Sequence, residues 1–234
     1  MALDIVVHKN VLIKILKDIF TDIHIGPILG FKGGTAAYLF YDLDRFSVDL
    51  DFDLLDESKS DEVFERFGTI LRGYGRLKRE DKKRYTLFYL LSYNDKDINA
   101  QNIKVEINRR NFDSNFDVLA YLGISMNVMV KEDMVAHKLV ALFERSGRAN
   151  RDIYDVHYFL KQGWLVNHSI IKNRTGMESR DFYTKCLEII ESIDSKQILS
   201  GMGELLSAKQ KDWVKNHLVS DTIFLLKLQM SNFE

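Results

Sequence analysis

FKGGTAAYLFYDLDRFSVDLDFDLL, residues 31–55, combines a glycine pair and a hydroxyl with three aspartates at alternate positions. Successive side chains of a β-strand point to opposite faces, so Asp49, Asp51 and Asp53 are expected on one face of a strand. The apolar residues between them are expected to pack beneath the other face. Three carboxylates on one face repel one another, and a bound divalent cation removes that repulsion. The stretch therefore predicts a strand that carries a magnesium site.

The glycine pair of this stretch precedes a predicted helix over residues 35–41. Gly33 and Gly34 allow positive φ and close backbone approach, and the N–H groups at a helix start can hold phosphate oxygens. Thr35 adds a hydroxyl donor, and Lys32 adds a cation. A glycine pair before a helix is more often only a tight turn. The aspartates that follow favour phosphate binding, with a turn that holds a nucleoside triphosphate against the metal.

Length and composition indicate a globular protein with one sizeable core or two small domains. The chain has 234 residues, of which 46% are hydrophobic and 29% are charged. The formal net charge of -1 hides basic clusters at residues 78–84 and 145–151, so a nucleic-acid partner is compatible with the sequence. We expect no membrane association and a cytoplasmic location, because neither a signal peptide nor a long apolar segment is evident. The single cysteine, Cys186, is expected in the core.

Periodicity predicts an α+β fold, with a small mixed or antiparallel sheet flanked by helices and followed by a C-terminal helical bundle. We expect two domains, residues 1–128 and 129–234. Strands are expected over residues 45–55, 84–93 and 102–108, with a polar turn at 94–101 between the last two, which form an antiparallel pair beside the first. Helices are expected over residues 9–24, 35–41, 61–74, 134–143, 151–160, 178–193 and 212–230.

A third carboxylate is expected on the strand over residues 102–108. Lys104 and Glu106 alternate with Val105 and Ile107, so the two charged residues share one face. Glu106 is suited to accept the proton of an attacking hydroxyl, or to help ligate a second metal ion. The simpler alternative is a solvated charge pair on an edge strand. The acidic pair earlier in the chain favours the site.

A further charged cluster lies on the predicted helices over residues 134–160. Asp152 and Asp155 are spaced three residues apart and therefore share a helix face. Lys138 offers an ammonium suited to triphosphate charge, although such a lysine is more often paired with an acid one turn away. His137 has no second histidine at the spacing of a zinc site, so we interpret it as structural.

KGGTAAYLFYDLDRFSVDLDF, residues 32–52, resembles the signature of AbiEii/AbiGii-type toxin nucleotidyltransferases, which belong to the DNA polymerase β-like superfamily. Gly33, Gly34 and Thr35 match the glycine turn of this family, Arg45 and Ser47 its lead-in, and Asp49 and Asp51 its acidic pair. KVEI at 104–107 is similar to the strand that carries the third acid, and AHKLVAL and RANRDIYD resemble the later lysine and aspartate motifs. The resemblance covers roughly residues 28–160.

The resemblance implies an enzyme in which residues 1–128 form the nucleotidyltransferase core and residues 129–234 a helical domain that completes the active site. Asp49, Asp51 and Glu106 would bind metal, Lys138 would contact nucleotide phosphates, and Asp152 would be the essential late acid, with Asp155 as its alternative. Lys32, Gly33, Gly34, Thr35, Arg45, Ser47 and Asp155 would bind the nucleotide.

The implied activity is Mg²⁺-dependent transfer of a nucleoside monophosphate from an NTP to an acceptor hydroxyl, with release of pyrophosphate. The resemblance points to tRNA or another RNA as acceptor and to a cognate antitoxin as partner, in a toxin–antitoxin or abortive-infection system. Two alternatives stay open. One is a nucleotidyltransferase that acts on a protein or a small molecule, and the other is a non-catalytic nucleotide-binding module.

Overall fold

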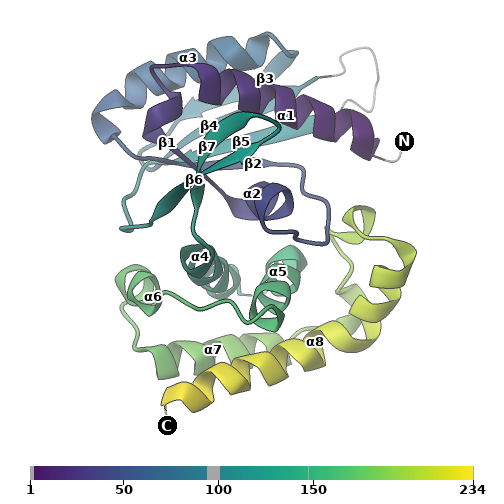
Figure 1. Cartoon of the computed structure of the whole chain (residues 1–234). Coiled ribbons are helices and arrows are strands. Elements are labelled where there is room, and N and C mark those ends of the chain that lie inside the picture. The colour runs from purple at the N-terminus through teal and green to yellow at the C-terminus, as the bar shows by residue number, and fades with distance from the viewer. Residues whose placement is uncertain (1–2, 94–100, 147, 234) are drawn as a thin grey trace. The chain divides into compact units, whose positions relative to one another are not determined.

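The computed structural model describes residues 3–93, 101–146 and 148–233, which form two compact units (Figure 1). The first unit comprises Met1–Asn111 and Asn115–Met129, and the second comprises Phe112–Ser114 and Val130–Glu234. The predicted turn at 94–101 lies almost wholly outside the described residues. A mixed sheet flanked by helices, with further helices toward the C-terminus, confirms the predicted α+β class.

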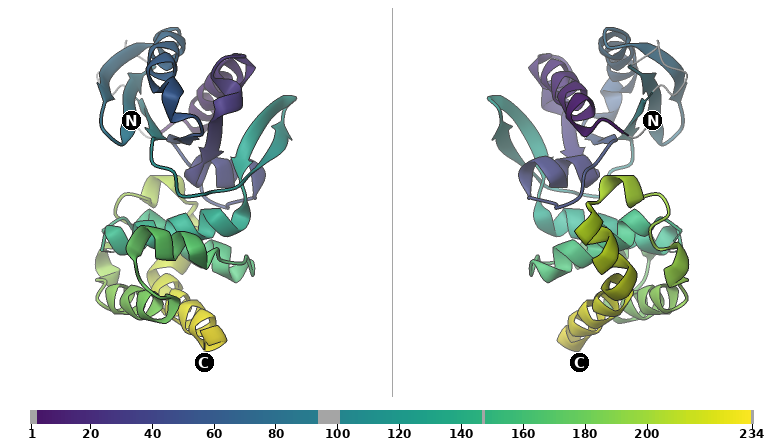
Figure 2. Two further views of the ribbon diagram at one scale, coloured as in Figure 1. Left: turned by 90° about the vertical axis from the view of Figure 1, so that its left-hand side faces the viewer. Right: turned by 90° about the vertical axis from the view of Figure 1, so that its right-hand side faces the viewer.

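The first unit is built on a seven-stranded sheet in the order β3-β4-β5-β2-β1-β7-β6. The pairs β1–β7 and β2–β5 are parallel, and the other neighbours are antiparallel. The β6–β7 hairpin forms one edge of the sheet and is visible in both views of Figure 2. The strands are β1 (Leu29–Lys32), β2 (Leu50–Leu54), β3 (Arg76–Lys82), β4 (Thr86–Ser92), β5 (Asn102–Asn108), β6 (Phe116–Tyr121) and β7 (Ile124–Met129).

Three helices accompany the sheet, namely α1 (Ile5–Thr21), α2 (Gly33–Phe40) and α3 (Ser60–Arg72). Helices α1 and α3 cover one face, and α2 lies on the other (Figure 1). The aromatic core beneath α3 joins Phe52 of β2 to Phe67 at 5.6 Å between ring centroids, and Phe67 stacks on Tyr89 of β4 at 5.9 Å. The apolar side of β2 therefore faces α1 and α3, as its alternation predicts, and its acidic side lies on the face that carries α2.

Several elements of this unit differ from expectation. The predicted strand over 45–55 begins only at Leu50, because the residues before it form an irregular lead-in whose side chains pack against the glycine turn. Strands β1, β3, β6 and β7 were not predicted. The antiparallel pairing of β4 with β5, and the position of β5 beside β2, agree with the prediction.

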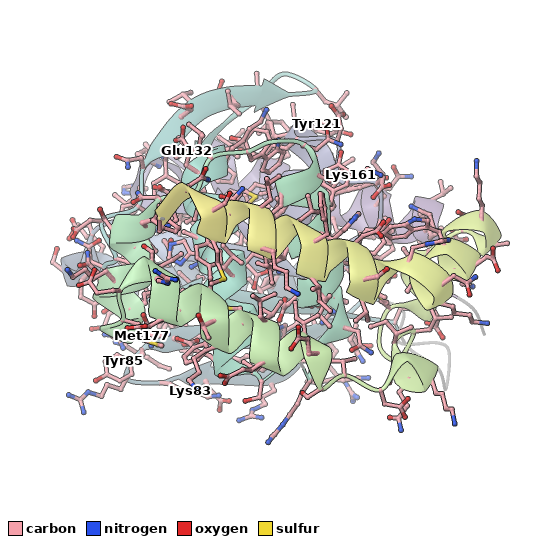
Figure 3. The ribbon with its side chains drawn as sticks, turned by 90° about the horizontal axis from the view of Figure 1, so that it is seen from below. Lys83, Tyr85, Tyr121, Glu132, Lys161 and Met177 are labelled. Carbon is pink, nitrogen blue, oxygen red and sulfur yellow. The ribbon has the colours of Figure 1, made fainter. Side chains whose placement is uncertain are left out.

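The second unit contains helices and, among its described residues, no strand. Its helices are α4 (Lys131–Glu144), α5 (Asn150–Lys161), α6 (His168–Thr175), α7 (Ser179–Glu191) and α8 (Ala208–Met230), of which α6 was not predicted. Helices α7 and α8 run alongside each other (Figure 3). Short 3-10 turns occur at Gly26–Ile28 and Glu57–Lys59 in the first unit and at Ser195–Gln197, Gly203–Leu205 and Ser231–Phe233 in the second. Cys186 is fully buried, and burial raises the pKa of its thiol to about 12, which fits its expected place in the core.

Candidate functional site

The acidic face of the sheet gathers three of the predicted site residues in the first unit. Asp51 of β2 lies directly across from Glu106 of the parallel strand β5. The Lys104 ammonium lies 2.9 Å from Glu106 Oε2 and 3.9 Å from Asp49 Oδ2, so the same cation is near both carboxylates. Asp49, Asp51 and Glu106 therefore converge on one small region of this face.

The charge of Lys104 is set by these three acids. Burial disfavours its ammonium form, but the nearby carboxylates of Asp51, Asp49 and Glu106 outweigh that cost and raise the pKa of Lys104 above its ordinary value. A positive charge thus stands among the carboxylates and reduces their mutual repulsion. The alternation of residues 104–107 predicts Lys104 beside Glu106, but its role as counter-ion of all three acids depends on the pairing of β2 with β5.

The glycine turn lies directly beside the acidic pair. Gly33 has φ +78°, and a Cβ built there would stand 2.5 Å from Asp51 Oδ2. A Cβ at Gly34 would stand 2.8 Å both from the Arg45 guanidinium and from the Ser47 hydroxyl. A side chain at either position would collide with these groups, so the two glycines are required by close approach as well as by backbone conformation.

The lead-in residues act inside the fold. Arg45 is 3% exposed, and its Nη1 donates to the Phe46 carbonyl at 2.9 Å. Thr35 is 1% exposed, and its hydroxyl contacts Ser47 Oγ at 3.0 Å and donates to the backbone carbonyl of Asp49. Thr35, predicted as a phosphate donor, therefore ties the start of α2 to the segment that carries Asp49.

Lys32 and Asp53 form a second charge pair on the same sheet face. Lys32 Nζ lies 2.5 Å from Asp53 Oδ1, and Asn108 Nδ2 donates to the same oxygen at 2.6 Å. Asp53 is 6% exposed. The positive charge of Lys32, predicted to contact phosphate, is therefore compensated by a neighbouring acid, and Asp53 has partners of its own apart from the acidic pair.

His8 of α1 is a residue near this site that sequence analysis missed. Its Nε2 lies 3.0 Å from the carbonyl of Val48, the residue before Asp49, and its Nδ1 lies 2.8 Å from the Tyr93 hydroxyl. Burial lowers the pKa of His8, although the Val48 carbonyl and the Asp49 carboxylate favour its charged form. The imidazole thus anchors the backbone next to an acidic residue, and no motif in the sequence signals it.

The donor set of the acidic face fits a hard divalent cation. Its oxygens come from Asp49, Asp51 and Glu106, and Mg²⁺ prefers one or two carboxylates together with substrate phosphates. Within residues 3–93, 101–146 and 148–233, no three His, Cys, Asp or Glu side chains form a ready-made cluster of metal ligands. The carboxylates instead surround the Lys104 ammonium, so a cation already occupies the position that their charges favour.

The second unit gathers the later predicted residues around one lysine. Lys138 Nζ of α4 lies 3.0 Å from Asp152 Oδ1 and 3.0 Å from Asp155 Oδ2, both on α5. Asp152 also accepts from Arg145 at 2.9 Å. The side chains of Asp152 and Asp155 are 3% and 0% exposed. Lys138 is therefore held by two buried carboxylates that share a helix face, as their spacing predicts.

The tautomer of His137 follows from its partners. A guanidinium can only donate, so Arg174 Nη1, at 2.8 Å, makes Nδ1 of His137 an acceptor. Nε2 then carries the proton and donates to Ser114 Oγ at 2.7 Å. A histidine that donates to a hydroxyl cannot deprotonate it, so these residues do not form a nucleophile and base pair. His137 is structural, as expected, and fastens residues 112–114 to α4.

Comparisons with known proteins identify the family. The family model described as "Nucleotidyl transferase AbiEii toxin, Type IV TA system" matches residues 14–214. No curated protein sequence matches the chain. The described residues include no helix with the length and apolar character needed to cross a membrane.

Solved structures share the fold. The MenT4 nucleotidyltransferase toxin Rv2826c from Mycobacterium tuberculosis H37Rv aligns with a TM-score of 0.65 and 17% identity, over 96% of this chain and 84% of that chain. JHP933 from Helicobacter pylori aligns with a TM-score of 0.56 and 18% identity, over 100% and 97%. At such identities the likeness concerns the fold alone.

Proposed function

We propose that this chain, which belongs to the AbiEii family of nucleotidyl transferase toxins of type IV toxin–antitoxin systems and is a nucleotidyltransferase, transfers a nucleoside monophosphate from an NTP to a hydroxyl of tRNA. One observation carries the proposal: Asp49, Asp51 and Glu106 converge beside a glycine turn that has no room for a side chain. Carboxylates suit a metal ion and a bare backbone turn suits phosphates, so the two together suit a metal-bound triphosphate.

Asp49, Asp51 and Glu106 are the residues that would hold Mg²⁺. When bound, this ion supplies charge neutralisation and orientation of the phosphate oxygens. The family belongs to a class of enzymes that act on nucleotides, and the all-oxygen donor set supports magnesium over a metal that prefers nitrogen or sulfur ligands.

The glycine turn receives the triphosphate through its backbone. The N–H groups at the start of α2 are available to phosphate oxygens, and Gly33 and Gly34 permit close approach. Because the Thr35 hydroxyl already donates to the Asp49 carbonyl, we assign Thr35 to positioning Asp49 and leave phosphate contact to the backbone. Arg45 and Ser47 support the turn from beneath, and the Lys32–Asp53 pair flanks it.

Glu106 accepts the proton of the attacking hydroxyl. About a third of its side chain is exposed, so an acceptor can reach it. The acceptor oxygen then forms a bond to the α-phosphorus, the bond from that phosphorus to the bridging oxygen breaks, and pyrophosphate leaves. The roles expected for Lys138, Asp152 and Asp155 in the second unit, phosphate contact and late acid, stay predictions.

A cognate antitoxin is the expected protein partner, because the family is that of toxins from type IV toxin–antitoxin systems. Addition of a nucleotide to the 3′ end of tRNA would block aminoacylation, and the toxic effect would then be arrest of translation. An antitoxin would relieve that effect.

The test compares wild type with Asp49→Asn and with the control Asp61→Asn, whose side chain is 89% exposed on α3, across the sheet from the acidic face. Each protein is incubated with total bacterial RNA, Mg²⁺ and each NTP radiolabelled at the α-phosphate, and RNA and protein are resolved on denaturing gels. Label on a tRNA-sized band with wild type and the control, but not with Asp49→Asn, is the expected result. Label on protein or on small molecules instead would mean that the acceptor is not tRNA. The absence of label with any NTP would contradict the proposal.

A further inference from the structure

The acidic face of the sheet continues past Glu106 onto the β3–β4 hairpin. Phe88 of β4 lies directly across from Glu106 in the antiparallel register, and Asp81 of β3 lies across from Phe88. Residues paired in this way point to the same face, so Phe88 shares the face of Glu106 and Asp51, with Cβ atoms of neighbours about 5 Å apart. Helices α1 and α3 lie over the opposite face (Figure 1).

Cations flank the Phe88 ring on this face. The Arg79 guanidinium lies 5.2 Å from its centroid, and the Lys83 ammonium lies 5.1 Å from it. Asp81 pairs with Arg79 at 2.5 Å, whereas no acid of the described residues 3–93, 101–146 and 148–233 pairs with Lys83. A planar ring with a planar guanidinium beside it offers two surfaces on which an unpaired base can stack.

The turn of the hairpin repeats this arrangement at Tyr85. The Arg84 guanidinium lies 4.9 Å from the ring centroid, and the Arg110 guanidinium lies 5.6 Å from it. The tyrosine is 46% exposed. Lys83 and Tyr85 both lie at the periphery of the molecule in the view of Figure 3. Two aromatic rings three positions apart therefore each carry two cationic neighbours.

Two basic residues next to these rings are neutralised within the fold. Lys82 pairs with Asp61, and Arg109 pairs with Glu57. These pairs point to α3 and to the segment before it. Lys82 and Arg109 therefore serve the structure, whereas the cations around Phe88 and Tyr85 lie against aromatic rings.

We propose that Phe88 and Tyr85, with Arg79, Lys83, Arg84 and Arg110, form a stacking platform for the single-stranded 3′ end of an RNA acceptor. The cations contact its phosphates and the rings stack against its terminal bases, which delivers the terminal hydroxyl to Glu106 one strand away. An acidic protein would use the charges but not the stacking surfaces, so the rings favour RNA. The inference rests on the proposed function, because it assigns the acceptor site of the same reaction.

The test measures binding of a fluorescently labelled single-stranded RNA oligonucleotide to the full chain by anisotropy, without NTP, across a salt series. Phe88→Leu and Tyr85→Leu remove stacking surface but keep apolar volume, and Lys83→Gln with Arg84→Gln removes two charges. Phe224→Leu on the exposed face of α8 is the aromatic control, and Lys14→Gln with Lys17→Gln on α1, which covers the opposite face of the sheet, is the charge control. Circular dichroism of each variant establishes that it is folded.

Each aromatic variant is expected to bind about five- to a hundred-fold more weakly than wild type, as for loss of one stacked base. The double charge variant is expected to reduce the slope of log affinity against log salt by about 1.4, the value for two phosphate contacts on a single strand. Both controls should bind as wild type does.

Folded platform variants that bind RNA as tightly as the controls would overturn the platform, even if wild type labels tRNA. Failure of wild type to bind the oligonucleotide would overturn it as well. Failure of wild type to label any RNA, with RNA binding lost in the platform variants alone, would overturn the proposed reaction and leave the binding site standing. Loss of antitoxin binding with normal RNA binding in the variants would assign the surface to protein.

Discussion

The ammonium of Lys104 lies 2.9 Å from a carboxylate oxygen of Glu106, in the position where the charges of Asp49 and Asp51 also favour a cation. The side chain of Lys104 is 32% exposed, so it can withdraw toward solvent. A divalent ion that enters this region competes with an internal cation for the same carboxylates. We therefore expect Lys104 to keep the acids together without metal and to weaken their affinity for a metal ion.

Lys104→Met is expected to bind Mg²⁺ or Mn²⁺ about fivefold more tightly, the equivalent of the ~1 kcal/mol that a partly exposed ion pair contributes. Without the Lys104 ammonium, the repulsion between the carboxylates is relieved by the bound metal ion instead of by the lysine. Isothermal titration calorimetry, or Mn²⁺ paramagnetic resonance without nucleotide, measures the affinity. Lys14→Met is the control. Unchanged or weaker metal binding by Lys104→Met would show that the lysine does not compete for the metal position.

Thr35→Val distinguishes a positioning role from a phosphate contact. The hydroxyl is buried and contacts Ser47 Oγ and the Asp49 carbonyl, so its loss should cost about 1–3 kcal/mol of the free energy of unfolding. Thr35→Ser keeps the hydroxyl and should restore most of this stability. Urea denaturation supplies the measurement, and nucleotide affinity is measured in parallel. A Thr35→Val protein of wild-type stability with weakened NTP binding would favour the phosphate contact predicted from the sequence.

Strand prediction succeeded where apolar residues alternate and failed where charge conceals the strand. Residues 102–108 were predicted with the bounds of β5, because three buried apolar residues alternate with polar ones. In β3, six of the seven residues in RLKREDK are charged. Its cross-strand pairing with β4 holds it in place, and the ion pairs Arg72–Glu80 and Lys82–Asp61 link it to α3. Such partners lie outside the strand itself, so the β-propensity of its seven residues contains no trace of them.

The acidic residues of the candidate site were predictable from the sequence, but the cations that pair with them were not. Alternation alone placed Asp51 and Asp53 on one face. The pairing of Asp53 with Lys32 requires the antiparallel register of β1 with β2, and the convergence on Lys104 requires the parallel register of β2 with β5. Asp53 therefore serves as the counter-ion of Lys32, although alternation alone does not distinguish it from Asp49 and Asp51.

Asp155→Asn tests the buried charge cluster of the second unit. Asp155 is fully buried and lies 3.0 Å from Lys138, so neutralising it leaves a lysine with one buried acid in place of two. We expect a loss of about 3 kcal/mol in the free energy of unfolding, as for removal of one partner from a buried pair. Arg145→Gln alters the same cluster at a side chain that is 55% exposed and should cost less than about 1 kcal/mol. Urea denaturation of both variants compares the two, and equal losses would contradict the assigned burial.

Gly33→Ala separates the steric demand of the turn from backbone strain. Gly33 and Gly123 have nearly the same φ, +78° and +79°, but a Cβ at Gly33 would stand 2.5 Å from Asp51 Oδ2 whereas one at Gly123 meets nothing within 4 Å. Both alanine variants should lose about 1 kcal/mol of stability from the left-handed conformation. Only Gly33→Ala should lose nucleotidyl transfer, because Asp51 must move. Equal activity in both variants would mean that the approach of the turn to Asp51 is not required for the reaction.

The imidazole of His8 makes the stability of the first unit depend on pH. Burial lowers the pKa of His8 below its ordinary value of 6.5, so the unfolded chain takes up this proton at a higher pH than the folded protein does. Its contribution to stability is therefore complete above about pH 6.5 and is lost as the pH falls through the folded pKa. Burial also lowers the pKa of His168 in the second unit, which provides a matched comparison.

Urea denaturation from about pH 8 to about pH 5 is expected to show a steeper loss of stability in wild type than in His8→Gln, because the variant has no proton to take up at this position. His168→Gln should remove a separate part of the slope and leave the part that belongs to His8. The His8→Gln protein should also be less stable at neutral pH, since the hydrogen bond to the Val48 carbonyl is altered. Identical slopes for wild type and His8→Gln would mean that His8 titrates normally in the folded protein, and would remove burial as the cause.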